Sequence, residues 1–321
     1  MLGRTLVLEV GRVTEGAAIA AAKLRGRGDM KASDKAATDA MRKELGRINI
    51  DGTVVIGEGE MDEAPMLYIG EKVGTGKGPA VDIAVDPLEG TTICAKNMPN
   101  ALAVLAISES GGLLHAPDMY MDKIAIGPGL PDGIVDLDAS PADNIKALAK
   151  ARGVPVEEIT ACILDRPRHA KLIAAVREVG AAVQLIPDGD IAGVIWTTDP
   201  DQTNIDIYLG SGGAPEGVLA AAALQCIGGQ MQGRLLPSND DERKRAENMG
   251  ADVSKKYTMD DMASGDVIFS ATGVTGGSLL DGVHFRGDFA ETETVVMRSQ
   301  TGTVRRVKTT FRNIGNKLAM L

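Results

Sequence analysis

The sequence predicts a mixed α/β fold, and three observations lead to that prediction. Two segments near the N-terminus, residues 6–24 and 33–48, carry apolar residues at helical spacing. Short β-rich segments separated by glycine and proline follow from Gly52 onward. From about residue 140, strand-like and helix-like segments alternate, which is typical of layered α/β folds.

The N-terminal segments show the clearest helical periodicity. The first ends at Gly26 and Gly28, and its apolar positions are Leu6, Val10, Val13, Ala17, Ala20 and Leu24. Ser33 is expected to cap the second helix, because a serine oxygen accepts a hydrogen bond from a free backbone N–H of the first turn. The apolar positions of that helix are Ala37, Met41, Leu45 and Ile48.

The segments after Gly52 are expected to form a sheet whose strands end in acidic residues; they span residues 53–60, 67–74, 80–87 and 100–108. Beyond Ser140, which should cap a helix with Pro141 at its first position, strands are expected at 160–165, 181–190 and 204–213. Helices are expected between and after them, at 169–180, 191–198 and 215–227.

These patterns indicate one compact unit, residues 1–321, with two intimate lobes. Residues 1–140 are expected to form the first half and residues 141–264 the second. The β-rich segment 265–310 is a candidate to pack on the first half.

Composition and charge exclude several classes of protein. The 321 residues can bury a large core, and 34 Lys and Arg against 44 Asp and Glu give a net charge of −10, which argues against a nucleic-acid binder. No apolar run reaches the length of a membrane span, and the N-terminus lacks the features of a signal peptide. We therefore expect a soluble, cytoplasmic protein. Its three cysteines, Cys94, Cys162 and Cys226, are expected to be buried, reduced and structural.

Acidic residues gather at predicted strand ends and in glycine-rich turns. Five short stretches carry them: Asp29 and Asp34; Glu58, Glu60, Asp62 and Glu63; Asp86 and Glu89; Asp188 and Asp190; and Glu216. Carboxylates brought together repel one another unless cations lie among them. Oxygen ligands without neighbouring Cys or His favour Mg²⁺ or Mn²⁺. The pattern therefore indicates a divalent-metal site, although one such turn alone would be only a solvated loop.

Phosphate-binding features lie beside these acids. Backbone N–H groups around Gly90–Thr91 and Gly212–Gly213 could surround phosphate oxygens, and Arg166 and Arg168 supply cations after a predicted strand. Metal ligands, a phosphate-binding turn and arginines together indicate phosphoryl chemistry on a small anion. Residues 1–140 are therefore expected to be the half that holds metal and phosphate, and residues 141–264 the half that binds the substrate.

The motif Asp86-Pro87-Leu88-Glu89-Gly90-Thr91 resembles the signature of the lithium-sensitive, metal-dependent sugar phosphatases, which usually have Asp in place of Glu89. With that Glu, and with GEGEMDEAPMLYIGEKVGTG before it, the chain resembles the class II fructose-1,6-bisphosphatases of bacteria. NALAVLAIS, APDMYM, RPRH, IPDGD, GGAPEG and VIFSATG follow in the family's order. The resemblance extends from about Thr14 to Arg306.

The resemblance implies a layered α/β/α/β/α sandwich, a homodimer or homotetramer, and a role in gluconeogenesis and glycerol metabolism. It implies two or more Mn²⁺ or Mg²⁺ ions in each active site. The implied metal ligands are Asp34, Glu58, Asp86, Glu89 and Glu216. The implied substrate-binding residues are Glu89, Gly90, Thr91, Tyr120, Arg166, Pro167, Arg168, Asp188, Gly189, Asp190 and Gly213.

The expected reaction is removal of the 1-phosphate of fructose 1,6-bisphosphate, which gives fructose 6-phosphate and inorganic phosphate. Thr91, Glu89, Asp86 and Glu58 are the expected catalytic residues, and we favour attack by metal-activated water assisted by Thr91 over attack by Thr91 itself. His169, beside the arginines, is expected to cap a helix.

Two alternatives remain open within the enzymes: a bifunctional fructose- and sedoheptulose-bisphosphatase, and an enzyme of inositol-phosphatase-like specificity. A monophosphate substrate would leave Arg166 and Arg168 without an anion. A third alternative is a non-catalytic regulatory protein that binds phospho-sugars, although the metal-ligand positions all hold carboxylates and Thr91 is present.

Overall fold

The computed structural model describes residues 2–59 and 66–312, and the chain divides into two compact units. The first contains Met1–Leu113 and Ser264–Leu321, and the second contains Leu114–Ala263. Each unit has its own mixed sheet with helices packed against it, so the mixed α/β class predicted from the sequence is confirmed. Glu60, Asp62 and Glu63, three of the acids singled out above, lie outside the described residues.

The first unit is built on an eight-stranded sheet with the order β12-β13-β11-β4-β3-β1-β2, in which β14 pairs with β13. Among the described residues of this sheet, β1 and β3 are the only strands that pair in parallel. Its strands are β1 (Asp51–Ile56), β2 (Lys72–Val73), β3 (Ala80–Glu89), β4 (Leu102–Glu109), β11 (Val267–Gly273), β12 (His284–Arg286), β13 (Phe289–Arg298) and β14 (Thr303–Arg312). The C-terminal segment therefore joins the N-terminal sheet, because β11 pairs with β4 along its whole length.

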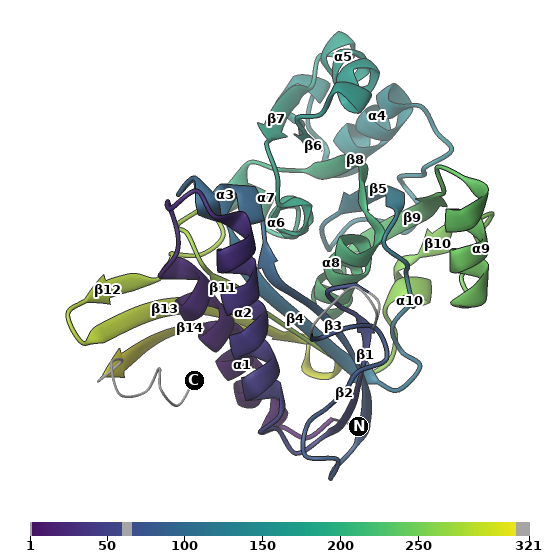
Figure 1. The fold of residues 1–321 in the computed structure, drawn as a ribbon. Coiled ribbons are helices and arrows are strands. Elements are labelled where there is room, and N and C mark those ends of the chain that lie inside the picture. Colours follow the sequence, from purple (N-terminus) through teal and green to yellow (C-terminus); the bar gives the residue numbers. More distant parts are fainter. Residues whose placement is uncertain (1, 60–65, 313–321) are drawn as a thin grey trace. The chain divides into compact units, whose positions relative to one another are not determined.

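Helices α1 (Leu6–Ala22) and α2 (Met30–Leu45) lie along this sheet (Figure 1). Most apolar residues of α1 are buried against β3, β4, β11 and β13, whereas Leu8 is exposed, and α2 packs on α1 and β3. Two shorter elements, α3 (Thr91–Ala95) and the 3₁₀ turn η3 (Ser299–Thr301), complete the unit. The helical periodicity of the N-terminal sequence thus identified the face that forms the core.

The start of α2 differs from the expectation. Asp29, not Ser33, is the N-cap: its backbone is extended and its Oδ1 accepts a hydrogen bond of 2.9 Å from the N–H of Ala32. Ser33 lies inside the first turn, where its hydroxyl donates to the carbonyl oxygens of Asp29 and Met30. Aspartate and serine can both cap a helix, and the cap here is Asp29 because its backbone is not helical.

Replacing this cap should cost a measurable part of the stability. Asp29→Ala leaves an N–H of the first turn without its acceptor, and we expect the free energy of unfolding to fall by about 1 kcal/mol. Asp39→Ala is the matched control on the same helix: it removes only an exposed ion pair with Lys35, and a change within about 0.5 kcal/mol is expected. Urea unfolding of both variants measures the difference, and equal effects would contradict the cap assignment.

The second unit is built on a six-stranded sheet with the order β10-β9-β5-β8-β6-β7. Strands β6 and β7 pair in parallel, as do β6 and β8, whereas β5 is antiparallel to β8 and β9. The strands are β5 (Tyr120–Ile126), β6 (Thr160–Leu164), β7 (Ala182–Ile186), β8 (Ile207–Gly213), β9 (Gln230–Leu236) and β10 (Tyr257–Thr258). Strand β5, which precedes the change of pattern at residue 140, thus belongs to this sheet.

Helices cover both faces of this sheet (Figure 1). Apolar residues of α4 and α5 pack with those of β5, β6 and β8, while α6 and α8 contact the same sheet from the other side. The helices are α4 (Pro141–Arg152), α5 (Ala170–Glu178), α6 (Asp190–Trp196), α7 (Pro200–Thr203), α8 (Ala214–Ile227), α9 (Asp240–Asn248) and α10 (Met259–Met262). The 3₁₀ turns are η1 (Val156–Glu158) and η2 (Pro167–His169).

Several local predictions are confirmed in this unit. Ser140 caps α4, Pro141 is at its first turn, and Gly153 ends it with a left-handed backbone. Cys162 and Cys226 are buried, as is Cys94 in the first unit, and burial raises the pKa of the Cys94 and Cys162 thiols. Within residues 2–59 and 66–312, none of the helices has the length and hydropathy needed to cross a bilayer.

Candidate active site

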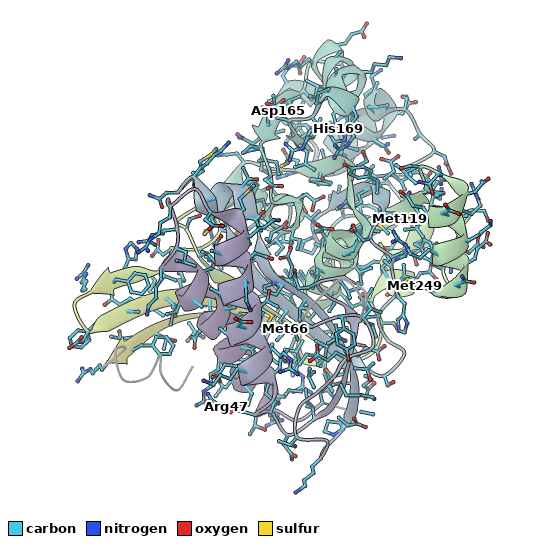
Figure 2. All side chains as sticks on the ribbon, viewed as in Figure 1. Arg47, Met66, Met119, Asp165, His169 and Met249 are labelled. Carbon is cyan, nitrogen blue, oxygen red and sulfur yellow. The ribbon has the colours of Figure 1, made fainter. Side chains whose placement is uncertain are left out.

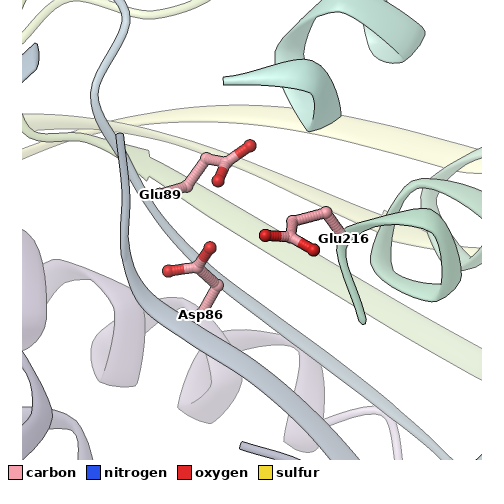
Figure 3. A group of neighbouring side chains, drawn as sticks. All are labelled: Asp86, Glu89 and Glu216. Carbon is pink, nitrogen blue, oxygen red and sulfur yellow. The ribbon is translucent and has the colours of Figure 1, made fainter. Parts of the chain in front are cut away.

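In the first unit, a bulge at the end of β3 brings two acids together. The pairing of β3 with β4 shifts between Asp86 and Glu89, where Pro87 has no N–H to donate to the neighbouring strand. In a regular strand, residues three apart point to opposite faces of the sheet, and the bulge removes that constraint. A carboxylate oxygen of Asp86 lies within 4.8 Å of one of Glu89 (Figure 3).

Glu89 is buried, and the chain turns immediately after it. Only 5% of Glu89 is exposed, and Gly90 has a left-handed φ of 83° that favours glycine at this position. Thr91 is then the first residue of α3. Two close carboxylates, one of them buried, are oxygen donors that fit a hard divalent cation such as Mg²⁺ or Mn²⁺.

The other two acids expected in this unit lie on separate elements. Asp34 is in the second turn of α2, and burial raises the pKa of its carboxyl group. Glu58 follows β1, where its N–H donates to the carbonyl of Leu67 at 2.9 Å. The segment before α2 is hydrogen-bonded to α3, since Gly26 and Gly28 donate to the carbonyls of Cys94 and Ala95.

In the second unit, the residues expected to bind substrate come together at one edge of the sheet. The parallel strands β6, β7 and β8 end there, at Leu164, Ile186 and Gly213. Because β5 is antiparallel to β8, its first residue, Tyr120, pairs with Gly213 at the same edge. Ligands bind at the carboxyl ends of strands in many α/β sheets. The residues concerned are Tyr120, Arg166, Pro167, Arg168, Asp188, Gly189, Asp190 and Gly213.

Two arginines leave the end of β6. Arg166 is extended, as expected before a proline, and forms an ion pair with Asp188 at 3.5 Å and a hydrogen bond to the Pro187 carbonyl. Burial raises the pKa of Asp188, and Arg166 opposes that rise. Arg168 lies over the ring of Tyr120, 4.6 Å from its centre, and donates to Ser211.

A buried ion pair lies behind the end of β8. The Lys123 ammonium group donates to Asp190 Oδ2 at 2.5 Å and to the Gly213 carbonyl at 2.9 Å, and only 1% of the Lys123 side chain is exposed. Tyr208 donates to the same Asp190 oxygen at 3.2 Å. A Cβ atom on Gly212 would lie 2.0 Å from Asp190 Oδ2, so glycine is needed for this close approach.

Glu216 lies in the first turn of α8 (Figure 3). Burial, followed by the nearby Asp190 carboxylate, raises the pKa of Glu216, whereas Lys123 lowers it. A Cβ atom on Gly213 would lie 1.9 Å from Glu216 Oε2, so the glycine also makes room for this carboxylate. A carboxylate whose charged form is disfavoured by burial is stabilised when a cation binds it.

Comparison with known proteins identifies the family. Residues 4–311 match the model of the bacterial, glpX-encoded fructose-1,6-bisphosphatases. This chain belongs to that family. It is 50% identical over 319 residues to fructose-1,6-bisphosphatase 1 class 2 of Escherichia coli strain K12, with 95% of this chain and 94% of the relative covered. The class 2 enzyme of Shigella flexneri matches with the same identity and coverage.

A solved inositol monophosphatase from Anabaena also matches, with 13% identity over 60% of this chain and 71% of that chain. Its TM-score of 0.31 is too low to bear on the fold. The assignment to the bisphosphatase family therefore depends on the match over residues 4–311 and on the class 2 relatives.

Lys123 and Ser211 of this bisphosphatase were not predicted from the sequence. His169 lies at the N-cap position of α5, as expected (Figure 2), but its side chain makes no capping hydrogen bond. The ring is buried and instead bonds Leu164 and Ser211. Lys123 follows Asp122 in the sequence, and nothing local indicates that its partner Asp190 lies 67 positions away. The Gly-Ser-Gly-Gly stretch at residues 210–213 was the one available signal for Ser211.

Proposed function

We propose that this chain is a metal-dependent phosphatase that hydrolyses the 1-phosphate of fructose 1,6-bisphosphate, giving fructose 6-phosphate and inorganic phosphate. The observation that carries the proposal is the acidic turn at the end of β3, where the close pair Asp86 and Glu89 directly precedes Gly90 and Thr91. The chain belongs to a family of fructose-1,6-bisphosphatases, and that membership supports the choice of substrate.

Asp34, Glu58, Asp86, Glu89 and Glu216 are the proposed ligands of two or more divalent cations, Mn²⁺ or Mg²⁺. The donor chemistry supports this set, because all five offer carboxylate oxygens. Bound cations would neutralise the phosphate and lower the pKa of the attacking water. Glu89, Gly90 and Thr91 would hold the phosphate that is cleaved.

The second phosphate of the substrate would bind near Arg166 and Arg168. A guanidinium group binds phosphate through two parallel hydrogen bonds, which explains a preference for arginine here. Tyr120, Asp188 and Asp190 would contact the sugar, together with the backbone of Pro167, Gly189 and Gly213. A bisphosphate would supply one phosphate to the turn at Gly90–Thr91 and the other to Arg166 and Arg168. A monophosphate would leave the two arginines without an anion.

Thr91 would orient the attacking water and accept its proton while its own hydroxyl proton passes to a carboxylate. Thr91→Ala should therefore lower kcat by about 10²- to 10⁴-fold, whereas Thr91→Ser keeps the hydroxyl and should retain kcat within about tenfold. Phosphate release at saturating substrate measures both variants. Isolation of a phosphothreonine at position 91 would instead support direct attack by the Thr91 hydroxyl.

The substrate is tested by phosphate release from fructose 1,6-bisphosphate, sedoheptulose 1,7-bisphosphate and inositol 1-phosphate, each in saturating Mn²⁺. We expect the highest kcat/KM with fructose 1,6-bisphosphate. Comparable values for both bisphosphates would indicate the bifunctional enzyme. Release from the inositol phosphate alone would reject the proposed substrate, and release from none of them, by folded metal-loaded protein, would favour a binding protein. The cytoplasmic location and the homodimer or homotetramer remain predictions.

A further inference from the structure

We propose that His169 and Ser211 are positioning residues that fix Arg168 in the orientation that binds the second phosphate of the substrate. This inference rests on the proposed function and extends it to two residues outside the substrate-binding set. The contacts that support it all lie within the second unit, at the ends of β6 and β8.

Ser211 holds one edge of the Arg168 guanidinium group. Arg168 Nε donates to Ser211 Oγ at 3.0 Å and lies 3.3 Å from its carbonyl oxygen, and Nη2 donates to that oxygen at 2.7 Å. The central carbon of the guanidinium group, Cζ, lies over the ring of Tyr120, 4.6 Å from the ring centre. A guanidinium group has five N–H donors, so the edge formed by Nη1 and Nη2 still offers two parallel donors to a phosphate.

An exposed arginine would otherwise populate many rotamers. Fixing a long side chain costs about 1.5–2 kcal/mol of rotamer entropy, and a site that fixes it before the ligand arrives removes that cost from binding. The two Ser211 oxygens therefore act on substrate affinity, because they select one Arg168 orientation in the free protein.

His169 in turn fixes Ser211. Its imidazole is 4% exposed, and its Nε2 accepts a hydrogen bond of 2.9 Å from the Ser211 backbone N–H. Since Nε2 is an acceptor, the ring proton lies on Nδ1, which donates to the Leu164 carbonyl at 2.8 Å. This neutral tautomer links the last residue of β6 to the end of β8.

Gly210 allows that link. Its φ of +132° favours glycine, and a Cβ atom there would lie 3.1 Å from the His169 ring. The strand can therefore approach the imidazole closely enough for the Ser211 N–H to reach Nε2. Leu164, His169, Ser211 and Arg168 thus form one continuous chain of hydrogen bonds.

The test compares Ser211→Ala and Ser211→Thr in the Mn²⁺-loaded protein. Ser211→Ala should raise KM for fructose 1,6-bisphosphate about three- to tenfold with kcat within about twofold, because it removes one hydrogen bond to a charged group. Ser211→Thr keeps the hydroxyl and should restore most of the affinity. Ser254→Ala, which removes an exposed hydroxyl bonded to Asp252 in the same unit, should change neither constant.

Two further readouts separate positioning from general structural damage. With fructose 1-phosphate, which lacks the second phosphate, wild type and Ser211→Ala should have the same kcat/KM. Adding Ser211→Ala to Arg168→Ala should have no further effect on KM, because the residue it positions is gone. His169→Asn, which loses the Nε2 acceptor, should raise KM for the bisphosphate and leave kcat/KM for fructose 1-phosphate unchanged.

An equal loss with both substrates, or additive effects in the double variant, would overturn the proposal. So would an unchanged KM in Ser211→Ala. If wild type binds fructose 1,6-bisphosphate by calorimetry but releases no phosphate, the proposed activity fails. Comparing the Kd values of wild type and the variants, for the bisphosphate and for fructose 1-phosphate, would then still decide whether His169 and Ser211 position Arg168.

Discussion

Glu89→Gln is expected to lower kcat for fructose 1,6-bisphosphate by about 10²- to 10³-fold. A loss of this size is typical when one stabilising group is removed from a preorganised site. The substitution preserves the shape of a side chain that is 5% exposed and replaces its negative charge with a neutral amide. The amide is a weaker ligand for a divalent cation than the carboxylate. Phosphate release at saturating substrate, in the presence of Mn²⁺, measures the effect.

Stability measurements distinguish this loss from misfolding. Without metal, Glu89→Gln should unfold at the same temperature as wild type or higher, because one of two carboxylates lying within 4.8 Å has been neutralised. With Mn²⁺, the wild type should gain thermal stability and the variant should gain less. Glu291→Gln on β13 of the same unit serves as the control and should keep full activity. A variant that retains kcat within threefold would exclude Glu89 from the metal and phosphate site.

Lys123→Met is expected to cause the largest loss of stability, about 3–5 kcal/mol in the free energy of unfolding. It leaves Asp190, whose side chain is 5% exposed, as a buried carboxylate without its ammonium partner, and it removes the donor to the Gly213 carbonyl. Both effects are costly because a buried polar group without a partner loses its hydration and gains nothing in exchange.

Two comparisons test this explanation by urea unfolding. Lys35→Met breaks the exposed pair with Asp39, whose side chains are 62% and 45% exposed, and should cost at most about 1 kcal/mol. Adding Asp190→Asn to Lys123→Met should recover part of the stability, since it removes the uncompensated charge. Equal losses in Lys123→Met and Lys35→Met would contradict the importance of the buried pair.

Elements with strong local signals could be predicted from the sequence. Ser140, Pro141 and Gly153 delimit α4 because a cap, a fixed proline φ and a left-handed glycine act within a few residues. Ser33 was a wrong choice, because Asp29 lies four positions earlier and is an equally good cap by residue type. The strand expected over 67–74 is reduced to Lys72–Val73, where pairing with β1 is the deciding factor. Such pairing is not encoded locally.

The acidic and basic residues proposed for the site were chosen from the sequence, because strand-end carboxylates and arginines stand out against apolar strands. The residues that support them could not be found in this way. Lys123 meets Asp190 only because β5 pairs with β8 and α6 packs against β8, and His169 meets Ser211 only because β6 and β8 pair in parallel. Residues that act through another side chain depend on such tertiary contacts, so residue type and spacing do not reveal them.

Removal of phosphate from fructose 1,6-bisphosphate, assisted by divalent cations that its carboxylates hold, is the activity we propose for this chain. The most direct test is phosphate release from fructose 1,6-bisphosphate in Mn²⁺, in Mg²⁺ and in excess chelator. We predict release with at least one cation, its loss on chelation, its return when the cation is restored, and no comparable return in Glu89→Gln. Phosphate release that is equal with and without excess chelator would contradict metal-dependent hydrolysis. So would the absence of release by folded protein with either cation.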